Sequence, residues 1–231
     1  MASMRKADRN IKPDLHLLSP IAKPAIIALF ITTMVFAATA QSGEKIPPGA
    51  SSQIPGAPRR HFRLHNPADL SPEEAEARYK KLRKLMARDY ATSGIAAAKV
   101  YQKWQRYNTA PYRSAAHGRR YVNHYANAKA RAYGNYEKAG KLPVGSVIAK
   151  DNLTVMSDGK TYPGALLLME KMPADFNYVS GDWKYTMILP DGSLFGTTNG
   201  VGSNKVRFCI GCHLAVEKQD HLYFPPKRYR K

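Results

Sequence analysis

The chain has 231 residues, of which 44% are hydrophobic, so it has room for one ordinary domain with appendages and a packed core. It carries 36 Lys and Arg residues against 17 Asp and Glu, a net charge of +19 at pH 7 that favours acidic partners over basic ones. It holds only two cysteines, which excludes a four-cysteine zinc centre.

The first 40 residues are typical of a secretory signal. Basic residues precede an apolar run over 25–40, which is shorter than the roughly 20 residues that a membrane-spanning helix needs. The run ends in Ala38-Thr39-Ala40, which fits a small-x-small cleavage site before Gln41. We therefore predict a signal peptide over 1–40 and an exported, periplasmic protein, with an uncleaved N-terminal anchor as the alternative. An exported protein rarely meets nucleic acid, so we expect an acidic redox partner protein or an anionic membrane surface instead.

A change of character near residue 71 marks the start of the folded part. Residues 41–70 are rich in Pro, Gly and Ser without an apolar period and are predicted to form a linker. Ser71, Pro72 and Glu74 then match a helix N-terminus with a capping box. The apolar period that follows predicts a helix over about 72–90 and a second helix over about 94–107. We expect the basic face of the first helix to be solvated, with a docking surface as the alternative.

After Pro111 the pattern becomes mostly β. Alternating side chains predict strands, and the predicted ranges are 119–127, 145–151, 165–172 and 182–189, with a short helix at about 127–138. Asp158-Gly159 and Asp191-Gly192 are typical of hairpin turns. The sequence therefore predicts an α+β fold over 71–231, in which a helical lead-in at 71–110 is followed by a β-rich antiparallel-sheet domain.

The stretch RFCIGCHLA at 207–215 contains both cysteines, Cys209 and Cys212, followed at once by His213. A zinc site needs four protein ligands when structural, or three when catalytic, and no second Cys/His pair stands at a matching spacing. A redox-active disulfide, as in a haem-free thiol–disulfide oxidoreductase, is compatible with export but gives the histidine no role. Both alternatives leave part of the motif unexplained.

A c-type haem gives all three residues a role. Two thiols three positions apart can bond to the two vinyl-derived carbons on one porphyrin edge, and His213 then lies under the iron as its proximal ligand. Covalent attachment requires export in bacteria, which the predicted signal supplies. We therefore predict one haem c per chain, bound through Cys209 and Cys212. Only 18 residues follow His213 and none is Met, which disfavours the small electron carriers that use a downstream Met ligand.

With these features the sequence resembles the cytochrome P-460 family. The resemblance covers about 104–226 and includes YNTAPYRSAAHGRRYVNHYAN, LPVGSVIAKD, GDWKYTMILPDGS and FCIGCH, in the order that the family shows. It implies a β-sandwich-like haem pocket, a homodimer and a five-coordinate iron with an open distal site. It also implies oxidation of hydroxylamine or nitric oxide. The related cytochromes c-prime-beta bind nitric oxide or carry electrons, which keeps a haem protein without turnover as an alternative.

Lys150 is the second candidate site residue. A period of two places it on the same strand face as Ile148, where a charged amine is costly and a neutral one is a nucleophile. From spacing alone, the simpler interpretation is a lysine at a strand end whose amine reaches water. In the P-460 family a lysine at this place bonds to a meso carbon of the porphyrin. The resemblance therefore implies a haem cross-link, with a catalytic role, for Lys150.

One departure from the family concerns proton transfer. Oxidising members carry a carboxylate shortly upstream of the haem motif, but residues 192–208 contain no Asp or Glu. Hydroxylamine oxidation releases protons, so a general base is useful, and Asn199 or Asn204 offers only a hydrogen bond. This favours a weaker oxidase, a nitric-oxide binder or a proton route elsewhere. We expect His117 and His124 to form hydrogen bonds in the core or at the surface, and His221 to lie at the surface. An internal sixth ligand to the iron is the alternative for His117 and His124, as it is for four methionines that we expect to fill the core: Met156, Met169, Met172 and Met187.

Overall fold

The computed structural model describes residues 63, 64 and 66–231. The predicted signal peptide or anchor at 1–40 and most of the predicted linker at 41–70 lie outside these residues. Within them, no helix is both long enough and apolar enough to cross a membrane.

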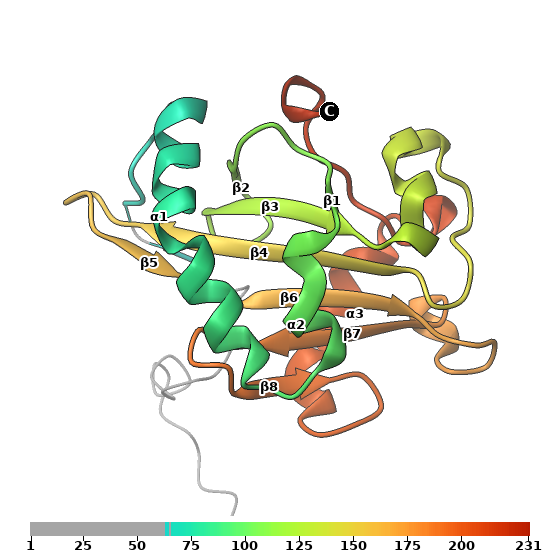
Figure 1. Cartoon of the computed structure of the whole chain (residues 1–231). Coiled ribbons are helices and arrows are strands. Elements are labelled where there is room, and N and C mark those ends of the chain that lie inside the picture. The colour runs from blue at the N-terminus through green and yellow to red at the C-terminus, as the bar shows by residue number, and fades with distance from the viewer. Residues whose placement is uncertain (1–62, 65) are drawn as a thin grey trace, which may run out of the picture. The chain divides into compact units, whose positions relative to one another are not determined.

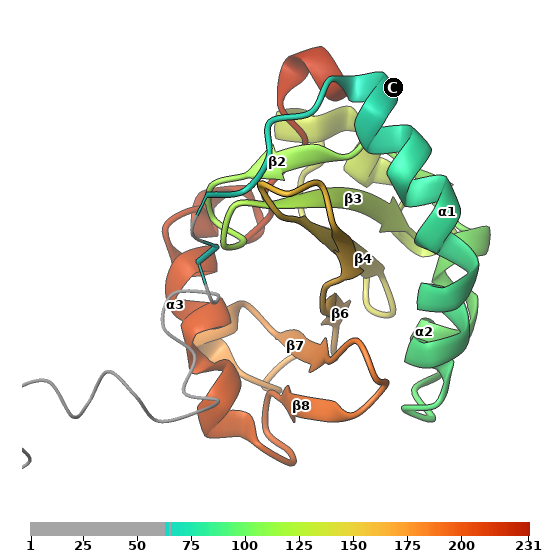
Figure 2. The same cartoon turned by 90° about the vertical axis from the view of Figure 1, so that its left-hand side faces the viewer.

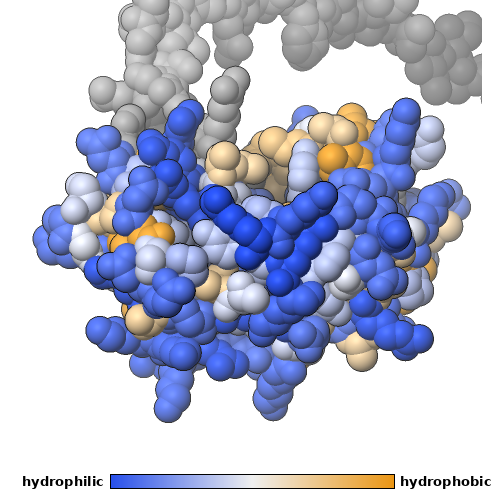
Figure 3. Space-filling model, turned by 90° about the horizontal axis from the view of Figure 1, so that it is seen from above, coloured by the Kyte–Doolittle hydropathy of each residue, from blue (hydrophilic) through white to orange (hydrophobic). Residues whose placement is uncertain are grey.

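Helix α1 (Pro72–Ala91) begins where its capping residues predict. The backbone N–H of Glu74 donates to Ser71 Oγ at 3.2 Å, and the Glu74 carboxylate accepts from the Ser71 N–H at 2.8 Å, which completes a capping box. The apolar face of α1 packs into the core through Tyr79, Met86 and Tyr90. Its basic side chains are exposed, as expected for a solvated face: Lys80, Lys81, Arg83, Lys84 and Arg88. The surface in Figure 3 is likewise mostly hydrophilic, with small separate apolar areas.

The predicted second helix is correct in position but wrong in length. Helix α2 (Ala96–Val100) continues only into the 3-10 turn η2 (Tyr101–Lys103). Trp104 then has an extended backbone, and strand β1 (Gln105–Arg106) pairs with Ala126 and Tyr125. The helix ends early because sheet pairing with residues about twenty positions later takes up the backbone groups of 105–106.

The strands form one antiparallel sheet of eight (Figure 1). Its main path is β1-β3-β4-β6-β7-β8, while β2 pairs with β3 and β5 pairs with β4. The bounds are β2 (Tyr112–Ser114), β3 (Arg120–Ala126), β4 (Val147–Val155), β5 (Thr161–Pro163), β6 (Leu166–Lys171), β7 (Trp183–Ile188) and β8 (Leu194–Thr197). Gly159 and Gly192 adopt positive φ in the two predicted hairpin turns. The α+β prediction, with helices before a β-rich antiparallel domain, is confirmed.

Short helical elements complete the chain. Among the residues described, they are η3 (Ala128–Lys138), η4 (Tyr178–Ser180), η5 (Ser203–Val206), α3 (Arg207–Leu214), η6 (Glu217–Gln219) and η7 (Lys227–Tyr229). The helix predicted at 127–138 is thus present as the 3-10 element η3, with a break at Tyr136, where φ is +53°.

The sheet separates two hydrophobic cores. Helices α1 and α2 cover one face and α3 lies on the other (Figure 2). Ala149 and Leu153 of β4 join the core under α1 and α2, whereas Ile148 joins the core that includes Cys209 of α3. Alternate side chains of β4 therefore point to opposite layers, which places Lys150 on the α3 side with Ile148.

A buried carboxylate fixes β4 from the helix side. Asp151 is 0% exposed and accepts hydrogen bonds from the hydroxyls of Tyr79 at 2.8 Å and Tyr101 at 2.9 Å, and from Asn123 Nδ2 at 2.9 Å. Burial raises the pKa of Asp151, while the three donors act in the opposite direction. These bonds join α1, η2 and β3 to the residue that directly follows Lys150, so they set the position of β4 at the site.

Candidate functional site

Helix α3 carries the entire CIGCH motif. Cys209 and His213 are four positions apart, so they share one side of the helix, and both are buried. Cys212 lies one turn from Cys209 and is exposed. Neither cysteine forms a disulfide. The helix thus presents one thiol and the imidazole to the interior and the other thiol at its outer edge.

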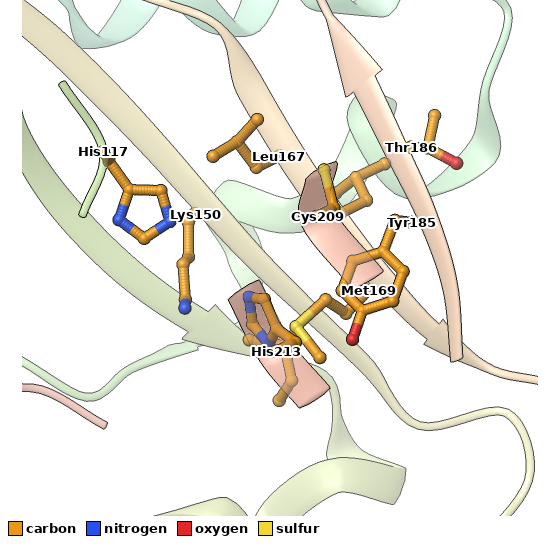
Figure 4. A pocket seen from close by; sticks show the side chains of 10 residues that line it. His117, Lys150, Leu167, Met169, Tyr185, Thr186, Cys209 and His213 are labelled. Atoms are coloured by element: carbon orange, nitrogen blue, oxygen red, sulfur yellow. The ribbon is translucent and has the colours of Figure 1, made fainter. Parts of the chain in front are cut away.

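A cavity lies between α3 and the sheet (Figure 4). Cys209 and His213 of α3 line one part of it, and Lys150 of β4 lines another. The remaining lining residues are mainly apolar, and they are Ile148, Leu167, Leu168, Met169, Tyr185 and Thr186, together with His117. Three of the four predicted site residues therefore meet at one cavity. The fourth, Cys212, is not among the lining residues.

The orientation of the His213 ring is fixed by the chain that follows it. His213 Nδ1–H donates to the carbonyl oxygen of His221 at 2.6 Å, which places the lone pair of the ring on Nε2. The rings of Tyr185 and Tyr223 flank the imidazole at centroid distances of 5.0 and 5.1 Å. An imidazole with Nδ1–H on a backbone carbonyl is the arrangement that metal-ligating histidines adopt.

His221 lies in a segment that folds back over the second core, here called the C-terminal strap (residues 220–224). The indole N–H of Trp183 donates to the Asp220 carbonyl at 2.9 Å, and Lys171 Nζ pairs with the Asp220 carboxylate at 2.5 Å. The expectation that His221 lies at the surface is wrong, because these contacts hold its ring against Gly181, where it is buried.

A chain of hydrogen bonds connects the strap to the sheet. Tyr133 Oη donates to the Tyr223 carbonyl at 2.7 Å, so it accepts the 2.6 Å bond from His124 Nδ1–H. His124 Nε2 is then the acceptor for the Tyr112 hydroxyl at 2.7 Å. We call Tyr112, His124 and Tyr133 the Tyr–His–Tyr chain. The direction of these bonds is set by the Tyr223 carbonyl, which can only accept. Because His124 donates through Nδ1 and accepts at Nε2, its imidazole is neutral.

Lys150 is enclosed by protein. Its residue is 4% exposed, and among the residues described its Nζ has no hydrogen-bond partner. Burial lowers the pKa of Lys150 to about 8, while the nearby Cys209 acts in the opposite direction. The interpretation as a strand-end lysine that reaches water is wrong, because β4 continues five residues further, to Val155, and keeps the amine inside.

Comparison with known families decides the class of protein. A model of the family described as Cytochrome P460 matches residues 98–224, more than half of the chain. The chain belongs to the cytochrome P460 family. Its members are haem cytochromes, so haem is the cofactor to place in this cavity. No curated protein matches the chain at a significant level.

The residues of this cytochrome fit a haem. The cavity is apolar in the main, yet Lys150 Nζ and Tyr185 Oη are buried there without hydrogen-bond partners in the described part of the chain. Unpaired buried polar atoms are costly unless a bound group meets them. A haem, which is flat and largely apolar, would contact the apolar side chains that line this cavity, and His213 Nε2 would be available to its iron.

The other two interpretations of the motif find no support in the geometry. Over residues 63, 64 and 66–231, no group of three or more His, Cys, Asp or Glu side chains is placed to hold a metal ion. Burial raises the pKa of Cys209 to about 12, the reverse of the lowered pKa that a reactive thiol needs.

Sequence reasoning missed several residues around the cavity. Tyr185 is predicted to share a strand face with Trp183, but no feature of the neighbouring sequence indicates that this face packs against α3. The strap also places the His221 carbonyl and the Tyr223 ring against His213. Their positions depend on a turn after α3 that no sequence motif marks. His117 is predicted as a hydrogen-bonding residue, with iron ligation as the alternative. Its place at the cavity results from the pairing of β2 with β3, which no local signal reports.

Proposed function

We propose that this P460 cytochrome carries one haem c, bonded to Cys209 and Cys212 and ligated by His213, and that it oxidises hydroxylamine or nitric oxide. The observation that carries the proposal is the meeting of Cys209, His213 and Lys150 at one largely apolar cavity. The motif supports covalent attachment, since the two thiols stand one helical turn apart, one at the cavity and one at the helix edge.

The chain's own residues define what the site can do. When bound, the haem would supply a redox-active iron that can take electrons from a small nitrogen compound. His213 would be the residue that holds the iron, through Nε2, because its Nδ1–H is fixed on the His221 carbonyl, and this bond raises the basicity of Nε2. The apolar side chains of Ile148, Leu167 and Met169 exclude water and favour small neutral molecules such as hydroxylamine and nitric oxide.

Lys150 is proposed to form a third covalent bond to the haem. Burial lowers its pKa to about 8, so a larger fraction of the amine is neutral and nucleophilic than in an exposed lysine. Joining the amine to a porphyrin meso carbon removes one hydrogen from each partner as two protons and two electrons. The reaction therefore needs a two-electron oxidant, for which a peroxide is a suitable class.

The test uses the full chain produced in a host with cytochrome c maturation. An intact mass increased by one haem, together with a haem c pyridine haemochrome spectrum, would support attachment. A red-shifted Soret band that returns to an ordinary position in Lys150→Arg would support the cross-link. Turnover of hydroxylamine or nitric oxide with an artificial electron acceptor tests the reaction. A matured protein without covalent haem would contradict the attachment to Cys209 and Cys212. A Soret band at the same position in the wild type and in Lys150→Arg would contradict the cross-link.

A nitric-oxide binder or electron carrier without turnover is the second candidate. It is favoured by the lack of acidic side chains, since none of the described residues that line the cavity is Asp or Glu. The same preparation separates the two functions. Stable nitric-oxide binding without consumption of hydroxylamine or nitric oxide would favour the second candidate, and multiple turnovers would favour the first.

Export and partners complete the proposal. The N-terminal sequence supports export to the periplasm, either with cleavage or with a retained anchor, and N-terminal sequencing of the mature protein separates these cases. The net charge of +19 supports an acidic redox partner protein or an anionic membrane surface. A homodimer is proposed from the family resemblance, and sedimentation of the matured protein tests it.

A further inference from the structure

His117 lies where two cavities share a wall. It belongs to the loop between β2 and β3 and lines the haem cavity together with Lys150 and His213 (Figure 4). It also lines a second cavity that does not include the haem motif. Leu167 is the other residue that lines both. The imidazole of His117 is therefore the titratable group in the wall between the two spaces.

The second cavity is more polar than the first. Arg120, Asn152 and Thr154 line it, and Arg120 Nε donates to Thr154 Oγ1 at 3.2 Å. Within the described chain, the buried amide oxygen of Asn152 has no hydrogen-bond donor. An unpaired buried acceptor in a polar cavity is the position where an ordered water donates. The second cavity is thus suited to hold water beside His117.

Ser114 supports His117 in either protonation state. The Ser114 hydroxyl lies 2.8 Å from His117 Nδ1 and also accepts from the His117 backbone N–H at 3.3 Å. A hydroxyl can donate to a neutral Nδ1, or turn and accept from Nδ1–H of an imidazolium. The contact keeps the ring in place while its charge changes, which is what a proton-transfer residue requires.

We propose that His117 accepts protons released in the haem cavity and passes them to water in the second cavity. The inference rests on the proposed oxidation of hydroxylamine. In the balanced reaction, two hydroxylamine molecules give nitrous oxide, water, four protons and four electrons. The electrons leave to a one-electron acceptor protein, and each proton bonds to Nε2 of His117 before it passes to water. This route replaces the missing carboxylate upstream of the haem motif.

The charged and titratable groups around His117 are consistent with this role. They are Lys150 on β4, Arg120 on β3, Tyr185 on β7, and Cys209 and His213 on α3. A protonated Lys150 would oppose a positive charge on His117. Bonding of the Lys150 nitrogen to the haem removes that ammonium, so a cross-linked site accepts a proton at His117 more readily than a site with free lysine.

The experiment measures ligand binding to the matured haem protein and needs no turnover. Hydrogen cyanide must lose its proton to bind a ferric haem as cyanide, whereas nitric oxide binds without proton release. In His117→Asn we expect cyanide association at neutral pH to slow at least tenfold, since general bases contribute about 10²–10⁴-fold, with nitric-oxide association unchanged. His117→Gln serves as a second variant if the first does not fold. Leu167→Met alters the same wall without removing a base, so its cyanide-to-nitric-oxide rate ratio should stay at the wild-type value.

Three results would overturn the role of His117. The first is a wild-type rate of cyanide association in His117→Asn, and the second is an equal slowing of both ligands, which would mean that His117 controls access only. The third is a wild-type low-spin spectrum that becomes high-spin in His117→Asn, because His117 would then be an iron ligand. Slowing of cyanide in Lys150→Met but not in His117→Asn would assign proton acceptance to Lys150 instead. If the ratio falls as expected but the wild type never oxidises hydroxylamine, the oxidase proposal fails while the proton acceptor remains.

Discussion

His124 and Lys150 are directly paired across β3 and β4, so their side chains leave the sheet on the same face. Both are almost completely buried, at 1% and 4% exposure. Burial lowers the pKa of His124 well below 6.5, and the positive charges of Lys150 and His213 lower it further. Two buried bases thus lie side by side, Lys150 in the lining of the haem cavity and His124 next to it, and each destabilises the fold when it is protonated.

The first prediction concerns acid. Protonation of His124 would place N–H on Nε2, where the Tyr112 hydroxyl donates, and would break the Tyr–His–Tyr chain. Because the folded pKa is lowered, the unfolded chain binds more protons below pH 6.5. The free energy of unfolding should therefore decrease as the pH is lowered below 6.5, by up to about 1.4 kcal/mol per pH unit. Urea unfolding from about pH 7 to about pH 5 measures the slope. His124→Gln should have a smaller slope, and an equal one would contradict this account.

Local chemistry predicts part of this structure. Ser71, Pro72 and Glu74 predict the start of α1 because a capping box needs only neighbouring residues. The alternation from Trp183 onward predicts β7 for the same reason. The CIGCH motif predicts the haem because its spacing alone matches the porphyrin edge.

Non-local pairing explains what the sequence does not predict. The second helix ends early because β1 pairs with β3, and nothing within 94–107 reports that partner. Lys150 lies in the middle of β4 because β5 folds back beyond Asp158-Gly159 and extends the pairing of β4. His221 is buried because the strap contacts Trp183, a residue 38 positions earlier in the chain. His117 reaches the haem cavity through the same kind of long-range packing.

The second prediction concerns Lys150 in protein without haem. Its amine is buried without a partner among the residues described, and its pKa is about 8 against an ordinary 10.5. Lys150→Met gives an unbranched, uncharged side chain that is one atom shorter, so we expect the haem-free variant to be more stable than the wild type by about 1–3 kcal/mol at neutral pH. Between pH 8 and 10.5 the unfolded wild type binds more protons, so its stability rises with pH relative to the variant and the difference narrows. Denaturant unfolding at several pH values tests this, and a less stable variant would contradict it.

The third prediction concerns Asp151, which accepts from Tyr79, Tyr101 and Asn123. Asp151→Ala leaves three buried donors without their acceptor, and we expect a loss of about 3–5 kcal/mol in the free energy of unfolding. Tyr101→Phe removes a single donor and keeps the ring, so about 1–2 kcal/mol is expected. Chemical denaturation of both variants gives the comparison. Equal losses would mean that the carboxylate does not hold the three donors together.

The last prediction concerns the link between the sheet and His213, the proposed iron ligand. Tyr133 Oη accepts from His124 and donates to the Tyr223 carbonyl, two residues beyond the carbonyl that accepts from His213. Tyr133→Phe removes both bonds and keeps the ring packing, so the strap should loosen and the bond from His213 Nδ1–H should weaken. A less basic imidazole stabilises ferric iron less, and the reduction potential of the matured protein should therefore rise.

The matched control is Tyr107→Phe, because the Tyr107 hydroxyl donates to the Arg131 carbonyl at 3.3 Å and takes no part in the Tyr–His–Tyr chain. Its ring packs edge-on against Tyr133, at a centroid distance of 5.3 Å, so the control tests the same neighbourhood. Redox titration of both variants, followed in the visible spectrum, should show a higher potential only for Tyr133→Phe. Equal potentials would mean that His213 is held by its own bond to the His221 carbonyl and that the chain through His124 serves only the stability of the fold.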